Sequence, residues 1–224
     1  MPGSVYQYPI IPSYPDVFES SARCIVPRTS RSPIHLLVDS SGLKVHVGSA
    51  RKPPKRRAWR KIHLAVDRDT GDVMAANLTA SNTPDAARVP ALLGQIDSEL
   101  DSFCGDGTYD KESVYDEVAA RSADRRTLVV IPPQRGALLH DDPALADRNR
   151  HIRSMQRVGR RGWHLRSGFT KRSRVENVVY RYKVILGREM KARTLAGQRV
   201  EARIGCGILN RMANLGMPQS FRAA

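Results

Sequence analysis

The stretch IHLAVDRDTGDVMAANLTA, residues 62–80, contains two runs of mainly apolar residues separated by DRDTGD. Each run has the length of a β-strand, and the Asp, Thr and Gly residues between them are typical of a tight turn. The stretch therefore predicts an antiparallel hairpin, and the rest of the sheet can be built outward from it.

Further strands are predicted on both sides of this hairpin. IHLLVDSSGLKV, 34–45, predicts a buried strand that ends at Asp39 and the turn residues after it. LDSFCGDGTYD, 100–110, predicts a strand that stops at a Gly-Asp-Gly turn, and TLVVIPP, 127–133, predicts one that is ended by two prolines. Helices are predicted in the remaining segments, at 83–96, 111–120, 144–161 (a helix or connector), through Glu176 to about 188, and 195–213.

This order of elements indicates the fold class. Three strands that can run antiparallel, followed by alternating helices and strands, predict an α/β fold with a mixed five-stranded sheet flanked by helices. One domain is expected over 34–217, with 1–33 as an irregular lead-in and 218–224 as a tail.

The charge balance points to a polyanionic partner. The chain carries 37 Lys and Arg against 22 Asp and Glu, a formal net charge of +15, and nucleic acid is the commonest polyanion in a cell. An acidic membrane surface competes, but the sequence has no run of 18 apolar residues and no lipidation signal. GRRG at 159–162 lacks the context of a phosphate-binding loop, so no nucleotide cofactor is expected.

The three cysteines, Cys24, Cys104 and Cys206, are too few and too widely spaced for a disulfide framework or a zinc site. This predicts a protein of the reducing cytoplasm.

Two acidic residues directly follow apolar strand segments, which is an unusual place for a charge. Asp39 follows IHLLV and Asp106 follows SFCG. For either one alone, a turn or helix-capping role is the simpler interpretation. Asp67 and Asp110 are also available, so position by itself does not identify a site.

A third acid stands alone in the basic segment TKRSRVENVVYRYK, 170–183. At about 100° per residue, Arg172, Glu176 and Lys183 share a helix face with Phe169 and Tyr180. The apolar side of the helix is predicted to consist of Val175, Val178, Val179, Ile185 and Leu186. A ladder of ion pairs is the simpler explanation of the charged face. If that face instead looks toward the ends of the first and fourth strands, three carboxylates converge and can bind Mg²⁺.

Several segments, taken in order, resemble bacterial insertion-sequence transposases with a DDE triad, most closely the insertion-sequence-family-five group. The matching segments cover roughly residues 33–217 and are HLLVDSSGLKV, RRAWRKIHLAVDRDTGDVMAANLTASNTPD, GDGTYDKESVYDEVAARS, LVVIPPQRGA and RSRVENVVYRYKVILGREMKAR. The resemblance implies an RNase H-like core. It also implies that Asp39, Asp106 and Glu176 are catalytic residues that bind two Mg²⁺ ions, with Mn²⁺ as a substitute.

The family's signature around the third acid is Tyr, two residues, Arg, three residues, Glu, six residues, Lys. Arg172, Glu176 and Lys183 match it, and the first and last of these are implied to bind DNA near the scissile phosphate. Phe169 stands in the Tyr position and lacks its hydroxyl. Members of the family also carry a substantial helical N-terminal region, whereas 33 irregular residues precede Ile34. An alternative expectation is therefore a truncated, catalytically silent DNA-binding fragment that interferes with a full-length enzyme.

Two further basic segments predict contacts with DNA. In RKPPKRRAWRK, 51–61, basic residues surround Trp59 and suggest a backbone clamp, although a core position is the simpler interpretation of Trp59 alone. The second segment, 148–174, predicts a track for DNA. The residues predicted to bind DNA besides Arg172 and Lys183 are Arg174, Arg56, Arg57, Trp59, Arg60 and Lys61.

Taken together, these patterns predict a DNA transposase that performs metal-dependent cleavage and strand transfer. Its expected partners are double-stranded DNA, as element ends and target, and further copies of itself on paired ends; its expected location is the cytoplasm, with the nucleoid. A structural RNA-binding protein stays possible if the carboxylates of Asp39, Asp106 and Glu176 prove to be scattered.

Overall fold

The structure is a computed structural model that describes residues 25, 27, 33–45, 59–121 and 126–215. The predicted lead-in at 1–33 lies almost wholly outside the described residues. The tail at 218–224 and two of the predicted DNA-binding residues, Arg56 and Arg57, lie outside them as well.

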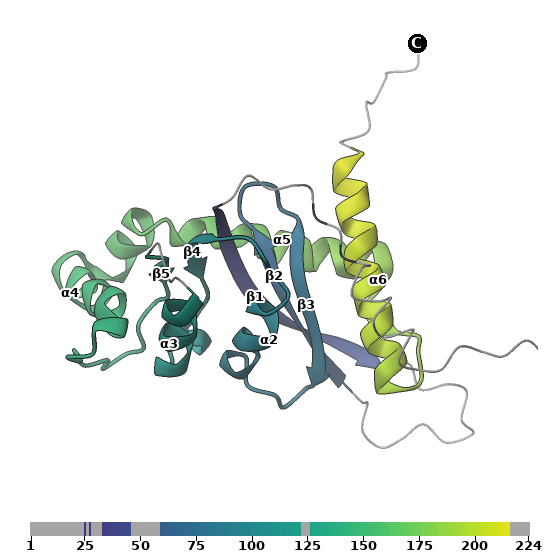
Figure 1. Cartoon of the computed structure of the whole chain (residues 1–224), viewed down its shortest axis with the longest axis horizontal. Coiled ribbons are helices and arrows are strands. Elements are labelled where there is room, and N and C mark those ends of the chain that lie inside the picture. The colour runs from purple at the N-terminus through teal and green to yellow at the C-terminus, as the bar shows by residue number, and fades with distance from the viewer. Residues whose placement is uncertain (1–24, 26, 28–32, 46–58, 122–125, 216–224) are drawn as a thin grey trace, which may run out of the picture.

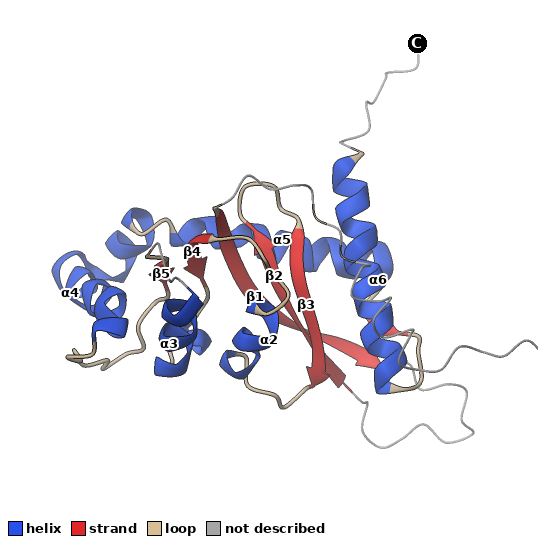
Figure 2. Cartoon of the chain, in the orientation of Figure 1, coloured by secondary structure: helices blue, strands red, loops and turns tan. Residues whose placement is uncertain are grey.

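A mixed sheet forms the centre of the molecule (Figures 1 and 2). Its order is β3-β2-β1-β4-β5, with β1 antiparallel to β2, β2 antiparallel to β3, and β4 and β5 parallel to β1. The strands span Ile34–Val45 (β1), Trp59–Asp67 (β2), Val73–Ala80 (β3), Leu100–Cys104 (β4) and Leu128–Val130 (β5). This is the arrangement of an RNase H-like fold, so the predicted fold class is confirmed.

The sheet differs from the prediction in two respects. A sixth strand, β6 (Glu189–Met190), pairs in parallel with the end of β1 at Lys44 and Val45. In addition, β1 does not end at Asp39, as the sequence suggested, but continues to Val45. The reason is β2, which pairs with β1 from Leu36 to Lys44 and supplies hydrogen-bonding partners across the Asp-Ser-Ser-Gly segment.

Helices cover both faces of this sheet. Those predicted at 111–120 and 195–213 agree to within one residue, whereas the one predicted at 83–96 is shorter and the one predicted at 144–161 continues to Arg166. They span Val89–Leu93 (α2), Glu112–Arg121 (α3), Ala146–Arg166 (α4), Ser173–Arg181 (α5) and Leu195–Asn214 (α6). The long helix α4 is kinked at Gly159, where φ is 70° and ψ is 168°. Glycine adopts this conformation without the steric cost that other residues pay. Among the described helices, none has both the length and the apolar composition needed to cross a bilayer.

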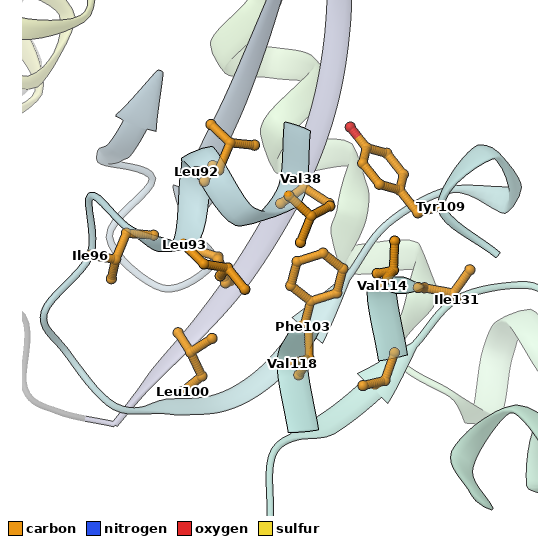
Figure 3. Close-up of a cluster of buried hydrophobic side chains, with 14 of the residues drawn as sticks. Val38, Leu92, Leu93, Ile96, Leu100, Phe103, Tyr109, Val114, Val118 and Ile131 are labelled. Atoms are coloured by element: carbon orange, nitrogen blue, oxygen red, sulfur yellow. The ribbon is translucent and has the colours of Figure 1, made fainter. Parts of the chain in front are cut away.

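Side chains that alternate along β1 supply two separate cores. Leu36 and Val38 point to one face, where they pack with Phe103 of β4 and with residues from α2 and α3 (Figure 3). Leu37 and Leu43 point to the other face, where they pack with α5, α6 and Trp163 of α4. Because the alternation continues through the strand, Asp39 and Ser41 belong to the face that α5 covers.

The helix through Glu176 deviates from its predicted phase beyond residue 181. Tyr182–Leu186 form a π turn, and Val184 and Ile185 are exposed while Tyr182 is buried. A π turn contains more residues than an α turn, so it rotates the buried face of the helix. The prediction that Ile185 belongs to the apolar side is therefore wrong.

His63 of β2 is buried between the sheet and Asp85, and it predicts a pH dependence of stability. Its Nε2 lies 2.9 Å from Oγ1 of Thr79, and its Nδ1 lies 3.4 Å from a carboxylate oxygen of Asp85. Burial lowers the pKa of His63 to about 4, although the Asp85 carboxylate acts in the opposite direction. The imidazole is therefore neutral at pH 7 in the folded protein.

In the unfolded chain His63 titrates near pH 6.5, so folding is favoured most above that pH and loses stability as the pH falls toward 4. Between pH 7.5 and pH 5 this residue should contribute a loss of about 2 kcal/mol in the free energy of unfolding. Urea denaturation at both pH values measures this loss. From pH 7.5 to pH 5, the free energy of unfolding should fall less for His63→Gln than for the wild type. Equal losses would contradict a neutral buried His63.

Candidate active site

The parallel pairing of β1 and β4 places Asp39 and Asp106 side by side. The last residues in register are Leu37 and Cys104; Asp39 lies two positions later on β1, and Asp106 lies two positions beyond the end of β4. Neighbouring strands lie about 4.8 Å apart. The register of the sheet therefore brings the two acids to the same place, at the point where β4 ends and β1 continues.

The turn after β4 fixes the direction of Asp106. A Cβ atom on the preceding residue, Gly105, would lie 2.8 Å from the Tyr109 ring and 3.1 Å from a Val38 methyl, so only glycine lets the chain pass here. Asp106 then caps a 3-10 turn, Gly107–Tyr109, and its Oδ1 accepts hydrogen bonds from the backbone N–H, at 2.8 Å, and from the hydroxyl of Thr108. The other carboxylate oxygen, Oδ2, faces the site.

The third acid comes from α5, which crosses the same face of the sheet behind β1 and β2 (Figure 1). Val175, Val178 and Tyr182 are buried against the sheet. Arg172, from the 3-10 turn Phe169–Arg172 before the helix, and Glu176 lie at the border of this buried face. The side chain of Glu176 is 56% exposed, whereas that of Arg172 is 13% exposed.

One guanidinium joins the three predicted acids. Nη2 of Arg172 lies 2.8 Å from Asp39 Oδ1 and 3.6 Å from Asp106 Oδ2, and Nη1 donates to Glu176 Oε1 at 2.6 Å. The structure thus brings Asp39, Asp106 and Glu176 together around Arg172. The simpler roles are present as well, because Asp106 caps the turn after β4 and Glu176 forms the i,i+4 pair with Arg172.

The electrostatics of the site follow from this geometry. Burial raises the pKa of Asp39; Arg172 opposes that effect, and the neighbouring Asp106 and Glu176 carboxylates add to it. Burial tends to lower the pKa of Arg172, but the three carboxylates outweigh it and raise that pKa. Two or more carboxylates in one place need a cation, and in this structure Arg172 supplies the positive charge.

Lys183 reaches the same region from the next turns of the helix. Its Nζ donates a hydrogen bond to Ser41 Oγ at 2.6 Å, and Ser41 lies on the same face of β1 as Asp39. Burial lowers the pKa of Lys183, and Arg188 adds to the effect. The sequence pattern did not single out Ser41. The only feature that could have indicated it is its position two residues after Asp39, which puts both side chains on the same face of a strand.

The donor set of the site suits a hard divalent cation. Three carboxylates provide oxygen ligands of the kind that Mg²⁺ prefers, and two of them are held by strand register and a capped turn. Their oxygens are separated by the Arg172 guanidinium. In the part of the chain that the structure describes, three acidic or histidine ligand atoms that all lie within 4.8 Å of one another occur in a different group, Glu112, His140 and Asp142.

The other predicted DNA-binding residues are spread over the sheet. Arg174 donates to the backbone oxygen of Asp69 at 3.0 Å, in the β2–β3 turn. Arg60 donates to Gln198 Oε1 at 2.8 Å and is paired with Leu43, four residues along β1 from Asp39.

Lys61 and Trp59 lie on the opposite face of β2 from Arg60. Lys61 pairs with Asp85 at 3.1 Å. Trp59 is 42% exposed, so it is not a core residue. Its ring lies over Gly42 and near Lys44, at the end of the sheet.

The basic segment at 148–174 separates into two groups. Arg148 pairs with the buried Asp110 at 2.9 Å, and Arg160 donates to the backbone oxygen of Pro133, so both hold the fold together. Four other arginines of α4 line a groove of about 820 Å³ between α4 and the edge strand β5. Those that line it are Arg150, Arg153, Arg157 and Arg166, above Leu128, Val130 and Trp163.

Comparison with known proteins places these features in context. The sequence model of the family described as "Transposase DDE domain" matches residues 30–211. Three solved structures show a weak likeness: the Mos1 mariner paired-end complex with Mn, the Mos1 transposase paired-end complex with left transposon end, and the Mos1 strand transfer complex.

Each of these is 11–12% identical in sequence, with TM-scores of 0.29, 0.31 and 0.30 in that order. The matches cover 94% of this chain and 66–67% of the other chains.

Proposed function

Because the chain belongs to the transposase DDE-domain family, we propose that it is a DNA transposase whose active site consists of Asp39, Asp106 and Glu176. The observation that supports this assignment most directly is the contact of one guanidinium with all three carboxylates. Within the family, the insertion-sequence-family-five group of bacteria fits best, and the cytoplasm, at the nucleoid, is the proposed location.

In the proposed mechanism the three carboxylates would hold two Mg²⁺ ions, and Mn²⁺ could replace them. When bound, such a pair activates a water or 3′-hydroxyl and stabilises the leaving oxygen of a phosphodiester. Asp39, held by strand register, and Asp106, held by the capped turn after β4, would provide two of the ligands. Glu176, at the exposed surface of α5, would provide the third.

The chain's own cations orient the DNA. Lys183 is held by Ser41 beside Asp39, where its ammonium can bind the phosphate next to the scissile one. Arg174 is exposed about two and a half turns before Lys183 and can bind the backbone further away. Arg60, Lys61 and Trp59 are proposed to contact the DNA only where it passes the far end of β1 and β2.

A strand-transfer assay tests the proposal. Pre-cut duplexes that carry the DNA flanking the gene, a target plasmid and Mg²⁺ or Mn²⁺ should give joined products, and omission of the metal should abolish them. Binding to DNA with no metal-dependent cleavage or joining would instead support the alternative, a silent fragment that interferes with a full-length transposase. Light scattering of the protein with the same duplexes measures the proposed self-association on paired ends.

The groove between α4 and β5 is proposed to carry the DNA backbone away from the active site, and this gives a further prediction. Replacing Arg153 and Arg157 by Gln should lower the slope of log K against log salt by about 2, because each phosphate contact contributes about 0.9. Fluorescence anisotropy of a labelled duplex over a salt series measures that slope.

The matched control replaces Arg193 and Arg211, which are exposed before and on α6, at the other end of the molecule (Figure 1). This variant has the same net charge and should keep the wild-type slope. Equal slopes for the two double variants would show that the groove does not bind DNA.

A further inference from the structure

Arg172 occupies the space that a cation between the three acids would need. Its two terminal nitrogens contact Asp39, Asp106 and Glu176 at 2.8, 3.6 and 2.6 Å, and only 13% of its side chain is exposed. Its Nε is buried and has no hydrogen-bond partner among the described residues. The residue is thus held by charge and has one unsatisfied donor, so it gains from a second partner that can accept more of its hydrogens.

A divalent cation and this guanidinium cannot use the same carboxylate oxygens at the same time. The two would be like charges a few ångströms apart in a partly buried site, where such repulsion is strong. Binding of a metal therefore requires that Arg172 withdraw from Asp39 and Asp106. In the absence of another anion, withdrawal costs Arg172 its ion pairs.

A DNA phosphate is the anion that can take Arg172 over. A guanidinium binds phosphate through two parallel N–H···O bonds, with a geometry as good as that for a carboxylate. Arg172 ends the 3-10 turn that begins after Gly168, at the solvent-facing N-terminal end of α5, and Lys171 and Arg174 beside it are exposed. Phosphates attracted to these neighbours arrive within reach of the Arg172 side chain.

We propose that Arg172 couples the two ligands of the site: it neutralises the triad while DNA is absent, and it transfers to a DNA phosphate when DNA binds. The inference rests on the proposed function. Its consequence is that the triad binds metal tightly only in the presence of DNA, which limits metal-dependent cleavage by unassembled protein. By linkage, metal must strengthen DNA binding by the same factor.

Binding of Mn²⁺ to the full chain tests this without any readout of activity. The free Mn²⁺ signal in electron paramagnetic resonance gives the affinity, with and without a duplex, after subtraction of the signal change for the Asp39→Asn variant under the same conditions. In the wild type, DNA should raise the Mn²⁺ affinity about tenfold or more, within the usual range of coupling between sites. In Arg172→Gln, the affinity without DNA should already be about tenfold higher, and added DNA should change it by less than about threefold.

Two further variants keep the test specific. Arg193→Gln removes the same charge at an exposed position before α6, away from the triad, and leaves the triad's counter-cation in place, so it should behave like the wild type. Arg172→Lys retains the charge with fewer donors and should show a smaller coupling than the wild type. A thermal unfolding curve for each variant confirms that it is folded.

If Arg172→Gln binds Mn²⁺ in the absence of DNA no more tightly than the wild type does, the coupling role of Arg172 is wrong. The transposase proposal would be unaffected by that result. Equally tight binding by the wild type with and without DNA would lead to the same conclusion. If neither protein binds Mn²⁺ above the Asp39→Asn background, with or without DNA, it is the proposed function that fails.

Discussion

Glu176→Gln should abolish strand transfer on pre-cut ends while leaving salt-sensitive DNA binding nearly unchanged. The substitution keeps the size of the side chain but removes the charge of the proposed third metal ligand. Metal ions stabilise the transition state of phosphodiester cleavage by several kcal/mol, so a loss of about 10³-fold or more in rate is expected. Product formation in the strand-transfer assay measures the first effect, and anisotropy measures the second.

The fold should tolerate this change. Glu176 is exposed and forms an i,i+4 pair with Arg172, and exposed pairs of this kind contribute only about 0.3–0.5 kcal/mol to stability. Glu112→Gln is the matched control, because it removes a carboxylate from the other acidic group, with His140 and Asp142. Activity that survives in Glu176→Gln but is lost in Glu112→Gln would move the metal site to that second group.

Trp163→Ala should cause the largest loss of stability among single substitutions of the described core. The indole is 1% exposed, and its Nε1–H donates to Nδ1 of His151 at 2.9 Å. Nε2 of His151 in turn donates to the backbone oxygen of Val129 at 2.8 Å, on the outer edge of β5. Loss of a buried aromatic ring costs about 3–5 kcal/mol, which for a chain of this size lowers the melting temperature by about 6–20 °C.

The same substitution should also weaken the active site. Trp163 contacts the Phe169 ring, with centroids 5.4 Å apart, and Phe169 begins the turn that ends at Arg172. Calorimetry measures the stability, and the Mn²⁺ titration in the presence of DNA measures the effect on the site. Trp163→Phe restores most of the burial and leaves His151 without its donor, so it should lose only about 1–3 kcal/mol. A melting temperature of Trp163→Ala within 2–3 °C of the wild type, about one kcal/mol, would contradict a core role.

Local sequence was sufficient to predict an element where the residues next to it in the chain determine its structure. The hairpin at 62–80 was found as predicted, because its turn residues and its apolar strands act over a few positions. It was insufficient at Asp39, where the cross-strand pairing with β2 carries β1 beyond the apparent turn. It was also insufficient at Ile185, where a π turn changes the phase of the helix.

The sequence by itself determined the excess of arginine and lysine and the α/β class of the fold, and it offered several acids at the ends of strands without choosing among them. Residue type and spacing carry that information, because charge and periodicity are local properties. Only the tertiary structure decided that Asp39 and Asp106 are neighbours, since their proximity depends on the register of two strands separated by more than fifty residues. Only the tertiary structure placed Arg172 between the three acids and not on the helix surface. That contact requires α5 to pack across the sheet at the position where Asp39 and Asp106 lie.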